Sequence, residues 1–154
     1  PGTYTVRLTI DDGILQRSDQ ISIEVDEYTL ANWQALHSGI GDLDDDFDID
    51  GKVNLAEFAL VLNPELPDLN APPLPGVEGN HLTITYTRLK PPSEVTYTVE
   101  LANEVDDWHE AAPGEVTEQI LSEIGPVQTV KVTDTIDLGA QPSRFMRVKI
   151  TKLP

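Results

Sequence analysis

Residues 46–57 read DFDIDGKVNLAE, and the interpretation of the whole chain starts from this stretch. If Asp46 is position one, carboxylates occupy positions one, three and five. A glycine stands at position six, where a cation-binding loop with this spacing turns with positive φ. Position seven would offer its backbone carbonyl to the bound cation. Position nine would offer a side-chain oxygen or a bound water, and position twelve a bidentate carboxylate. The spacing therefore predicts a Ca²⁺ site formed by Asp46, Asp48, Asp50, Lys52, Asn54 and Glu57.

Two simpler interpretations of this stretch stay open. An acidic run is often only a solvated loop, and Asn54 and Glu57 have the spacing of a capping box at the start of a helix. Six aspartates lie between Asp42 and Asp50, however, and no basic residue follows until Lys52. Their mutual repulsion favours a bound cation. Magnesium fits less well than calcium because it takes fewer protein ligands and keeps more of its waters.

The motif and the residues after it resemble a known arrangement. Residues 46–64, DFDIDGKVNLAEFALVLNP, resemble the linker of calcium loop and helix that precedes a C-terminal β-domain in many large secreted bacterial proteins. They are also similar to one half of a dockerin, an EF-hand-like calcium module that docks enzymes onto cohesins. A dockerin has two such loops, whereas this chain has one. Ile49 replaces the small residue common at position four, so we expect strain there without loss of a ligand.

Composition limits the classes of partner. The chain has 154 residues and a formal charge of −17, which argues against nucleic acid and against an anionic membrane surface. The sequence contains no cysteine and no apolar run of transmembrane length. Loops of this type fill where calcium is about millimolar, which indicates an extracellular or cell-surface location. Any secretion signal would lie upstream of residue 1.

Residues 1–25 predict a β-hairpin, because apolar and polar residues alternate on both sides of the turn Asp11–Gly13. Residues 1–27 resemble the last two strands of a PKD- or cadherin-like immunoglobulin-type domain. This resemblance implies upstream domains of the same polypeptide as partners. Alternatively, the hairpin belongs to the C-terminal β-domain. Asp11, Asp12 and Asp19 are either calcium ligands, as in cadherin-like junctions, or residues that shape the hairpin.

Residues 28–64 predict a helical linker that carries the calcium loop. A first short helix begins after Thr29 and ends at Ser38–Gly39. We expect its buried face to comprise Leu30, Trp33, Leu36 and His37. A second helix spans 54–62 and ends at Asn63–Pro64. Its expected buried residues are Leu55, Phe58, Ala59 and Leu62. Packing of Trp33 against this helix is favoured over a role as a platform for a ligand.

Residues 65–80 predict an extended proline-rich linker, and residues 81–154 predict a β-domain. Apolar alternation marks strands around 82–86, 97–101, 116–124, 127–132 and 146–150. Turn signals separate them at Lys90–Pro92, Pro113–Gly114, Gly125–Pro126 and Gly139. The expected fold is mainly β: an antiparallel immunoglobulin- or fibronectin-like β-sandwich that follows the hairpin and the helical EF-hand-like linker. The closing RFMRVKITKLP also resembles the terminal domain of the secreted proteins described above.

No motif for catalysis is visible. His37, His81 and His109 stand far apart without zinc-ligand spacing, and no phosphate loop is present. Trp108 and the tyrosines of the β-domain either line a sugar-binding face or fill the sandwich core. The bases Arg144, Arg147, Lys149 and Lys152 form either an ordinary solvated face or a docking surface for an acidic partner.

The sequence therefore favours a non-catalytic, calcium-stabilised segment at the C-terminus of an extracellular or cell-surface bacterial protein. Its expected role is to make the arrangement of neighbouring domains rigid. One alternative is a recognition module, either a dockerin-like plug for another protein chain or a binder of polysaccharide. A second alternative is a subunit of an extracellular assembly, in which the edge of the hairpin pairs with a neighbouring chain. A second calcium site is left open.

Overall fold

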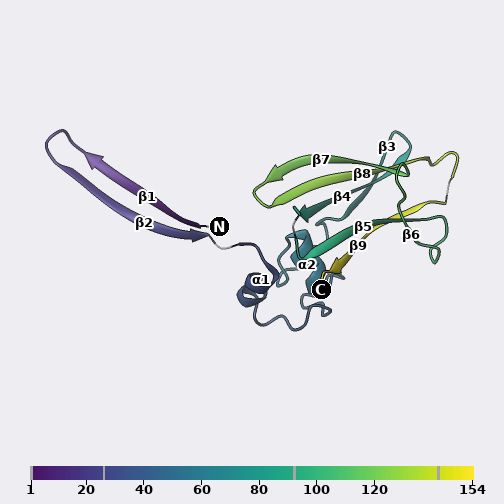
Figure 1. The fold of residues 1–154 in the computed structure, drawn as a ribbon, viewed down its shortest axis with the longest axis horizontal. Coiled ribbons are helices and arrows are strands. Elements are labelled where there is room, and N and C mark those ends of the chain that lie inside the picture. Colours follow the sequence, from purple (N-terminus) through teal and green to yellow (C-terminus); the bar gives the residue numbers. More distant parts are fainter. Residues whose placement is uncertain (1, 26, 92, 142) are drawn as a thin grey trace.

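The computed structural model of the protein describes residues 2–25, 27–91, 93–141 and 143–154. The fold is mainly β, with antiparallel sheets and two short helices (Figure 1). The elements are β1 (Gly2–Asp11), β2 (Gln16–Val25), α1 (Leu30–Leu36), α2 (Asn54–Leu60), β3 (Leu74–Glu78), β4 (His81–Leu89), β5 (Val95–Ala102), β6 (His109–Glu110), β7 (Val116–Ile124), β8 (Val127–Asp137) and β9 (Phe145–Lys152). Expectations for Pro1, Asp26 and Pro92 fall outside the described residues. Neither helix is long and apolar enough to cross a membrane.

The predicted hairpin is present as β1 and β2, which pair in antiparallel register from Gly2↔Val25 to Asp11↔Gln16. Its turn is stabilised by carboxylates, since Asp11 accepts from the N–H of Gly13 at 2.8 Å and Asp12 accepts from the N–H of Leu15 at 2.7 Å. Asp11 and Asp12 therefore shape the turn. The hairpin extends away from the rest of the chain (Figure 1).

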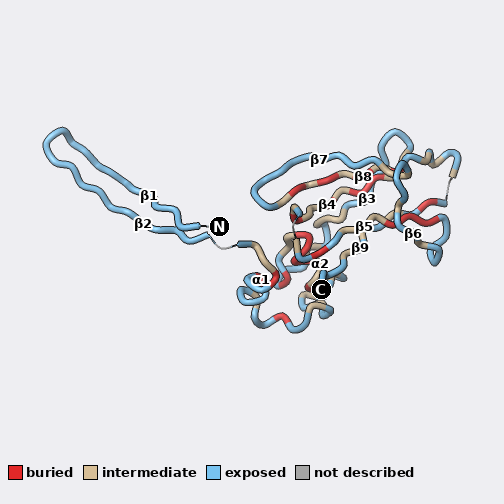
Figure 2. Tube along the Cα trace, viewed as in Figure 1, coloured by how far each residue is buried: buried red, intermediate tan, exposed pale blue. Residues whose placement is uncertain are grey.

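Every described residue of β1 and β2 is exposed (Figure 2). Alternation and register place seven apolar side chains on one face of the ribbon, and each is 46–65% exposed. They are Tyr4, Val6, Leu8, Ile10, Ile21, Ile23 and Val25. No segment among the described residues covers this face, and a two-stranded ribbon of this kind is at best marginally stable alone in water.

The remaining strands form two antiparallel sheets, with orders β3-β4-β8-β7 and β6-β5-β9. Tyr86, Val130 and Val132 of the first sheet pack with Val99 and Val148 of the second. This arrangement is consistent with a β-sandwich. The five strands predicted between residues 82 and 150 are confirmed as β4, β5, β7, β8 and β9, and β8 extends further than expected, to Asp137.

The expected linker at 65–80 is wrong in its second half, because Leu74–Glu78 forms β3 and pairs with β4. Pro75 lies within β3. A proline cannot donate a hydrogen bond to a central ladder, but it is tolerated at the edge of a sheet, where β3 lies. The two-residue strand β6 was too short to leave a sequence pattern.

The helical segment shares a hydrophobic core with the β-sandwich. Leu30 and Trp33 of α1 and Phe58 of α2 are buried in one cluster with Leu89 and Val95 of the sheets. Trp33 lies edge-on to Phe58, with ring centroids 5.7 Å apart, so its predicted role in packing is confirmed. Thr29 caps α1 as expected by accepting from the N–H of Asn32.

The C-terminal carbonyl groups of α2 are satisfied by side chains from outside the helix. The hydroxyl of Tyr28 donates to the carbonyl of Phe58 at 3.1 Å, and that of Tyr97 donates to the carbonyl of Ala59 at 2.6 Å. The hydroxyl of Thr87 donates to the carbonyl of Leu60. Since a helix of seven residues is not stable alone, these bonds and the shared core hold α2 in place.

The expected buried faces of the helices are corrected at two leucines. Leu36 is 78% exposed although it lies at helical spacing from Trp33, whereas Leu60 is only 2% exposed. Leu60 contributes to the core between the sheets, while Phe58 belongs to the cluster with α1. The helix is thus buried on two sides, which a single amphipathic face does not anticipate.

Replacing these two leucines should have different effects on stability. We expect Leu60→Ala to lower the free energy of unfolding by about 2–5 kcal/mol, because it leaves a cavity in the core. The control, Leu36→Ala, should change it by less than about 0.5 kcal/mol. Urea unfolding followed by circular dichroism measures both. Equal losses in the two variants would contradict the burial of α2 between two clusters.

Candidate metal site

The loop that begins at Asp46 gathers three carboxylates. Asp46, Asp48 and Asp50 each offer an oxygen, and these oxygens lie within 4.8 Å of one another. Among the residues that the structure describes, this is the group of His, Cys, Asp or Glu residues whose spacing suits a metal ion. The three residues are half-buried, and their loop lies between α1 and α2 in the sequence.

Backbone N–H groups of the loop hold these carboxylates in position. Asp46 accepts from the N–H of Asp50 at 3.2 Å and from that of Gly51 at 2.9 Å. Asp48 also accepts from the N–H of Asp50, at 3.2 Å, and Asp50 accepts from the N–H of Lys52 at 2.9 Å. Such short-range bonds stabilise the tight turn and hold the carboxylates close together.

Two residues of the loop have positive φ. Gly51 has φ of 92°, as position six requires. A Cβ at this position would meet no atom within 4 Å, so backbone conformation alone selects glycine. Ile49 has φ of 63°, which is unfavourable for a β-branched residue. The expected strain at position four is therefore present, while Ile49 itself is 86% exposed.

Glu57 is fully buried beside this cluster, and its burial is the least expected feature of the site. Neither of its carboxylate oxygens has a hydrogen-bond partner among the described residues. The same holds for one oxygen of Asp48 and for the side-chain oxygen of Asn54. Buried carboxylate and amide oxygens normally have partners, so these four oxygens of the loop and of α2 have acceptor capacity that the described residues do not use.

The charges of the cluster act on one another. Burial, followed by the negative charges of Asp48 and Asp50, raises the pKa of Glu57 to about 7. Burial likewise raises the pKa of Asp48. Burial acts on Asp50 in the same direction, but hydrogen bonds from Lys52 and Asp68 outweigh it and keep the pKa of Asp50 below its usual value. For Glu57 and Asp48, nearby hydrogen bonds and positive charge therefore do not offset burial and repulsion, and the pKa stays above its usual value.

Asn54 and Lys52 make contacts around the loop that the sequence did not indicate. The amide nitrogen of Asn54 donates to the carbonyls of Ile40 and Asp42, at 3.0 and 2.7 Å, and so fixes the chain that enters the loop. Asn54 is not the residue before α2, because Val53 occupies the cap position without a side-chain cap bond. The capping-box interpretation is thus not observed. The ammonium of Lys52 lies 2.6 Å from Asp50.

Three of the six aspartates lie outside the cluster. Asp42, Asp44 and Asp45 are exposed, and Asp45 instead accepts from the N–H of Asp42 at 2.8 Å. The histidines are also apart from it: His37 lies 3.3 Å from Glu65 and His109 lies 3.3 Å from Glu115. Asp46, Asp48 and Asp50, with Glu57 beside them, therefore define the site.

The aromatic residues of the β-domain do not form an exposed face. Tyr86 is 1% exposed, and its ring stacks with that of Tyr97, with centroids 6.1 Å apart. The guanidinium of Arg147 lies 4.1 Å from the centroid of the Trp108 ring. The tyrosines of the strands therefore fill the core, and Trp108 is partly covered by a cation–π contact.

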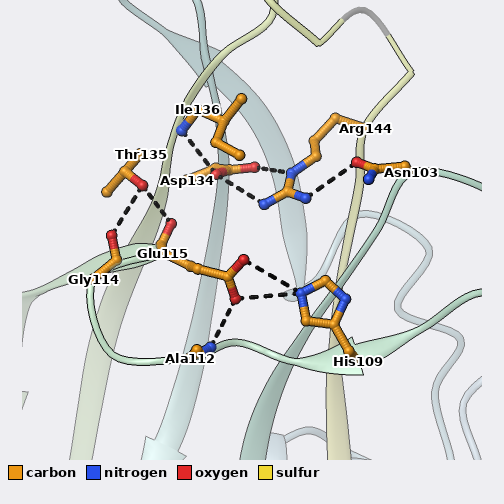
Figure 3. A network of polar contacts seen from close by, with 9 residues as sticks. All are labelled: Asn103, His109, Ala112, Gly114, Glu115, Asp134, Thr135, Ile136 and Arg144. Atoms are coloured by element: carbon orange, nitrogen blue, oxygen red, sulfur yellow. Dashed lines mark hydrogen bonds and ion pairs between the residues drawn. The ribbon is translucent and has the colours of Figure 1, made fainter.

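A second polar cluster includes Asp134 near the end of β8 and Arg144 just before β9 (Figure 3). Arg144 and Asp134 are buried and form a two-point ion pair, at 2.6 and 3.3 Å, and Arg144 also donates to Asn103 at 3.2 Å. The expectation of a solvated face is wrong for Arg144, which precedes β9 and points inward. No buried side-chain atom of this cluster is without a partner in the described chain, so it is a structural network.

Comparisons of the chain with protein-family models, with curated proteins and with solved structures found no match. Function is therefore inferred from the geometry of the loop.

Relieving the strain at position four should stabilise the protein. Asparagine tolerates positive φ better than isoleucine, so we expect Ile49→Asn to raise the free energy of unfolding by about 1 kcal/mol. The control is Phe47→Asn, since Phe47 is also exposed in the loop but is not among the residues of positive φ. Chemical unfolding in urea provides the measurement. If both variants gained the same free energy of unfolding, the positive φ of Ile49 would not be the cause.

The raised pKa of Glu57 predicts how stability depends on pH without metal. Between about pH 4.5 and about 7 the folded state holds a proton on Glu57 that the unfolded state has released. Stability should therefore fall as the pH rises through this window and level off above it. We expect the melting temperature in EDTA to show this slope and Glu57→Gln to flatten it. A melting temperature that rises with pH over this window in the native protein, unaffected by Glu57→Gln, would contradict the burial of this carboxylate.

Proposed function

We propose that this chain binds one Ca²⁺ ion and that the bound ion has a structural, non-catalytic role. The proposed ligands are the side chains of Asp46, Asp48, Asp50, Asn54 and Glu57 and the backbone carbonyl of Lys52. Bound Ca²⁺ would supply two positive charges to this site. The residues of the chain supply the oxygens, the turn that brings them together and the packing that holds the site against the β-sandwich.

The observation that carries this proposal is the buried carboxylate of Glu57. Neither of its oxygens has a partner in the part of the chain that the structure describes, and the charges of Asp46, Asp48 and Asp50 all raise its pKa. A solvated acidic loop would leave its carboxylates in water, whereas this one buries the residue at position twelve completely. Burial of an unpaired carboxylate is costly, and a cation among the oxygens would remove that cost.

The donor set favours calcium among the common metals. All proposed ligands are oxygens, and neither histidine nor cysteine is present in the loop, which disfavours zinc and other softer metals. Four carboxylates and one ammonium, that of Lys52, leave a net charge of −3 at the site when all are ionised. Six protein ligands suit Ca²⁺, whereas Mg²⁺ usually keeps several waters.

The place of Glu57 in α2 explains what binding would do to the structure. Glu57 is followed directly by Phe58, Ala59 and Leu60, which fill the core and whose carbonyls accept from hydroxyls outside the helix. Binding at Glu57 would therefore fix the loop and the helix together on the end of the β-sandwich. Because the ion binds the folded site, its binding free energy adds to folding stability.

The proposed setting is an extracellular or cell-surface bacterial protein, where calcium is about millimolar. The β-sandwich would be of the immunoglobulin or fibronectin type, and the loop would be EF-hand-like. The uncovered apolar face of the hairpin supports the view that β1 and β2 belong to a further immunoglobulin-like domain of the same polypeptide. Calcium would then limit the relative motion of two domains.

The rival function of sugar binding receives less support. Stacking on a sugar needs exposed aromatic rings, and Tyr86 and Tyr97 instead pack in the core. A dockerin-like plug normally uses two calcium loops, and the described chain has one carboxylate cluster of this kind. The free edges of the hairpin are compatible with assembly through strand pairing, but they do not explain the orphaned oxygens of the loop.

Glu57→Gln tests the proposal, because its effect should change sign with calcium. Without calcium the substitution removes a buried charge, so the melting temperature should rise near pH 8. With excess calcium the native protein should gain several degrees, and the variant should gain much less, since it lacks the closing carboxylate. Calorimetric titration of metal-stripped protein would measure binding directly.

The control for charge is Glu104→Gln, which alters the net charge equally at an exposed position. It should bind calcium like the native protein. If the native protein shows no saturable binding at one site, or if Glu57→Gln keeps the full stabilisation by calcium, the proposed role of the loop is wrong.

A further inference from the structure

The side chain of Lys52 connects the loop to a distant part of the chain. Its ammonium donates to Asp50 Oδ2 at 2.6 Å and to the backbone carbonyl of Asp68 at 2.9 Å. The side chain of Asp50 has no exposed surface and that of Lys52 is 17% exposed. This ion pair is shielded from water, so it constrains geometry more than a surface pair does.

Both backbone groups of Asp68 are held by the loop. The N–H of Asp68 donates to Asp50 Oδ2 at 2.9 Å, while its carbonyl accepts from Lys52. No hydrogen bond involves the side chain of Asp68 among the described residues, so the contact depends on its backbone alone. Asp68 lies between the end of α2 and the start of β3, and this contact fixes the path of the chain between them.

The two oxygens of Asp50 have different amounts of free acceptor capacity. A carboxylate oxygen has about two lone-pair sites. On Oδ2 both are used, by the ammonium of Lys52 and by the N–H of Asp68. On Oδ1 one is used, by the N–H of Lys52. Oδ1 is therefore the oxygen left for a metal, and Oδ2 faces the segment around Asp68.

We propose that Asp50 and Lys52 couple the metal loop to β3, so that occupation of the loop stabilises the attachment of this edge strand. This inference rests on the calcium site proposed above. A metal held by Oδ1 fixes the orientation of the whole carboxylate, and with it the two bonds made at Oδ2. Lys52 thus acts as a positioning residue through its side chain, besides offering its carbonyl to the site.

The strand that would respond is weakly held. Among the described strands β3 pairs only with β4, and Pro75 within it cannot donate a ladder hydrogen bond. If the contact at Asp68 opened, the segment that leads into β3 would lose two hydrogen bonds that hold it to the loop. Its detachment would uncover the edge of β4. The coupling would therefore let calcium protect one edge of the larger sheet.

Amide hydrogen exchange on the full chain, in EDTA and in excess calcium, tests this coupling. In the native protein, calcium should slow exchange at the loop amides of Asp50 and Gly51 and also at Asp68 and in β3. In Lys52→Met the loop should still respond, because the backbone carbonyl remains. The added protection at Asp68 should fall about tenfold, since a hydrogen-bonded charge is lost.

Two further variants serve as controls. Lys52→Arg keeps a cationic donor and should restore much of the protection. Asp68→Ala keeps both backbone groups and should behave like the native protein. The coupling is refuted if calcium protects Asp50 and Gly51 but leaves Asp68 unchanged, or if Lys52→Met responds in full. If the loop amides of the native protein do not respond to calcium, the proposed metal site fails, and the coupling fails with it.

Discussion

A carboxylate buried without hydrogen-bond partners has to be compensated, and the carboxylate of Glu57 is the group on which the described site depends. Its position follows from α2, where Phe58 and Leu60 occupy the core on either side. The helix cannot turn Glu57 toward water without removing these residues from the core. The core therefore forces an acidic group into a buried place beside Asp46, Asp48 and Asp50. The proposed binding of a cation would resolve this conflict between packing and charge.

The helix α2 also joins the loop to the β-sandwich. Its first N–H groups lie against the loop, where Asn54 donates to the carbonyl of Asp45 at 2.8 Å and Leu55 donates to that of Leu43 at 2.9 Å. Its last carbonyls accept from Tyr28, Tyr97 and Thr87. Seven residues suffice because both ends are bonded to other parts of the chain. The helix therefore connects the loop directly with the sheets.

The two polar clusters of the protein illustrate different uses of buried charge. Arg144 and Asp134 compensate each other within the chain, and Asn103 adds a further bond (Figure 3). The loop has one cation, Lys52, whose ammonium is engaged at Asp50 and Asp68. Glu57 is left without a partner among the described residues. The first cluster is satisfied within the described chain, whereas the second leaves carboxylate oxygens available for the proposed ligand.

The sequence alone determined the hairpin, the loop and the longer strands of the β-domain, because each depends on local patterns. Alternation predicted β4, β5, β7, β8 and β9, and the spacing from Asp46 to Asp50 predicted the convergent carboxylates. Such patterns record local periodicity and backbone requirements, such as the positive φ at Gly51.

Only the tertiary structure decided which side chains are buried and which groups lack partners among the described residues. It exposed Leu36, buried Leu60, turned Arg144 toward Asp134 and placed Asp68 against the loop. It also made β3 from a proline-rich segment, since pairing with β4 is a long-range choice. These outcomes depend on contacts between residues far apart in the chain, such as those that bury Phe58 and Leu60 and with them Glu57.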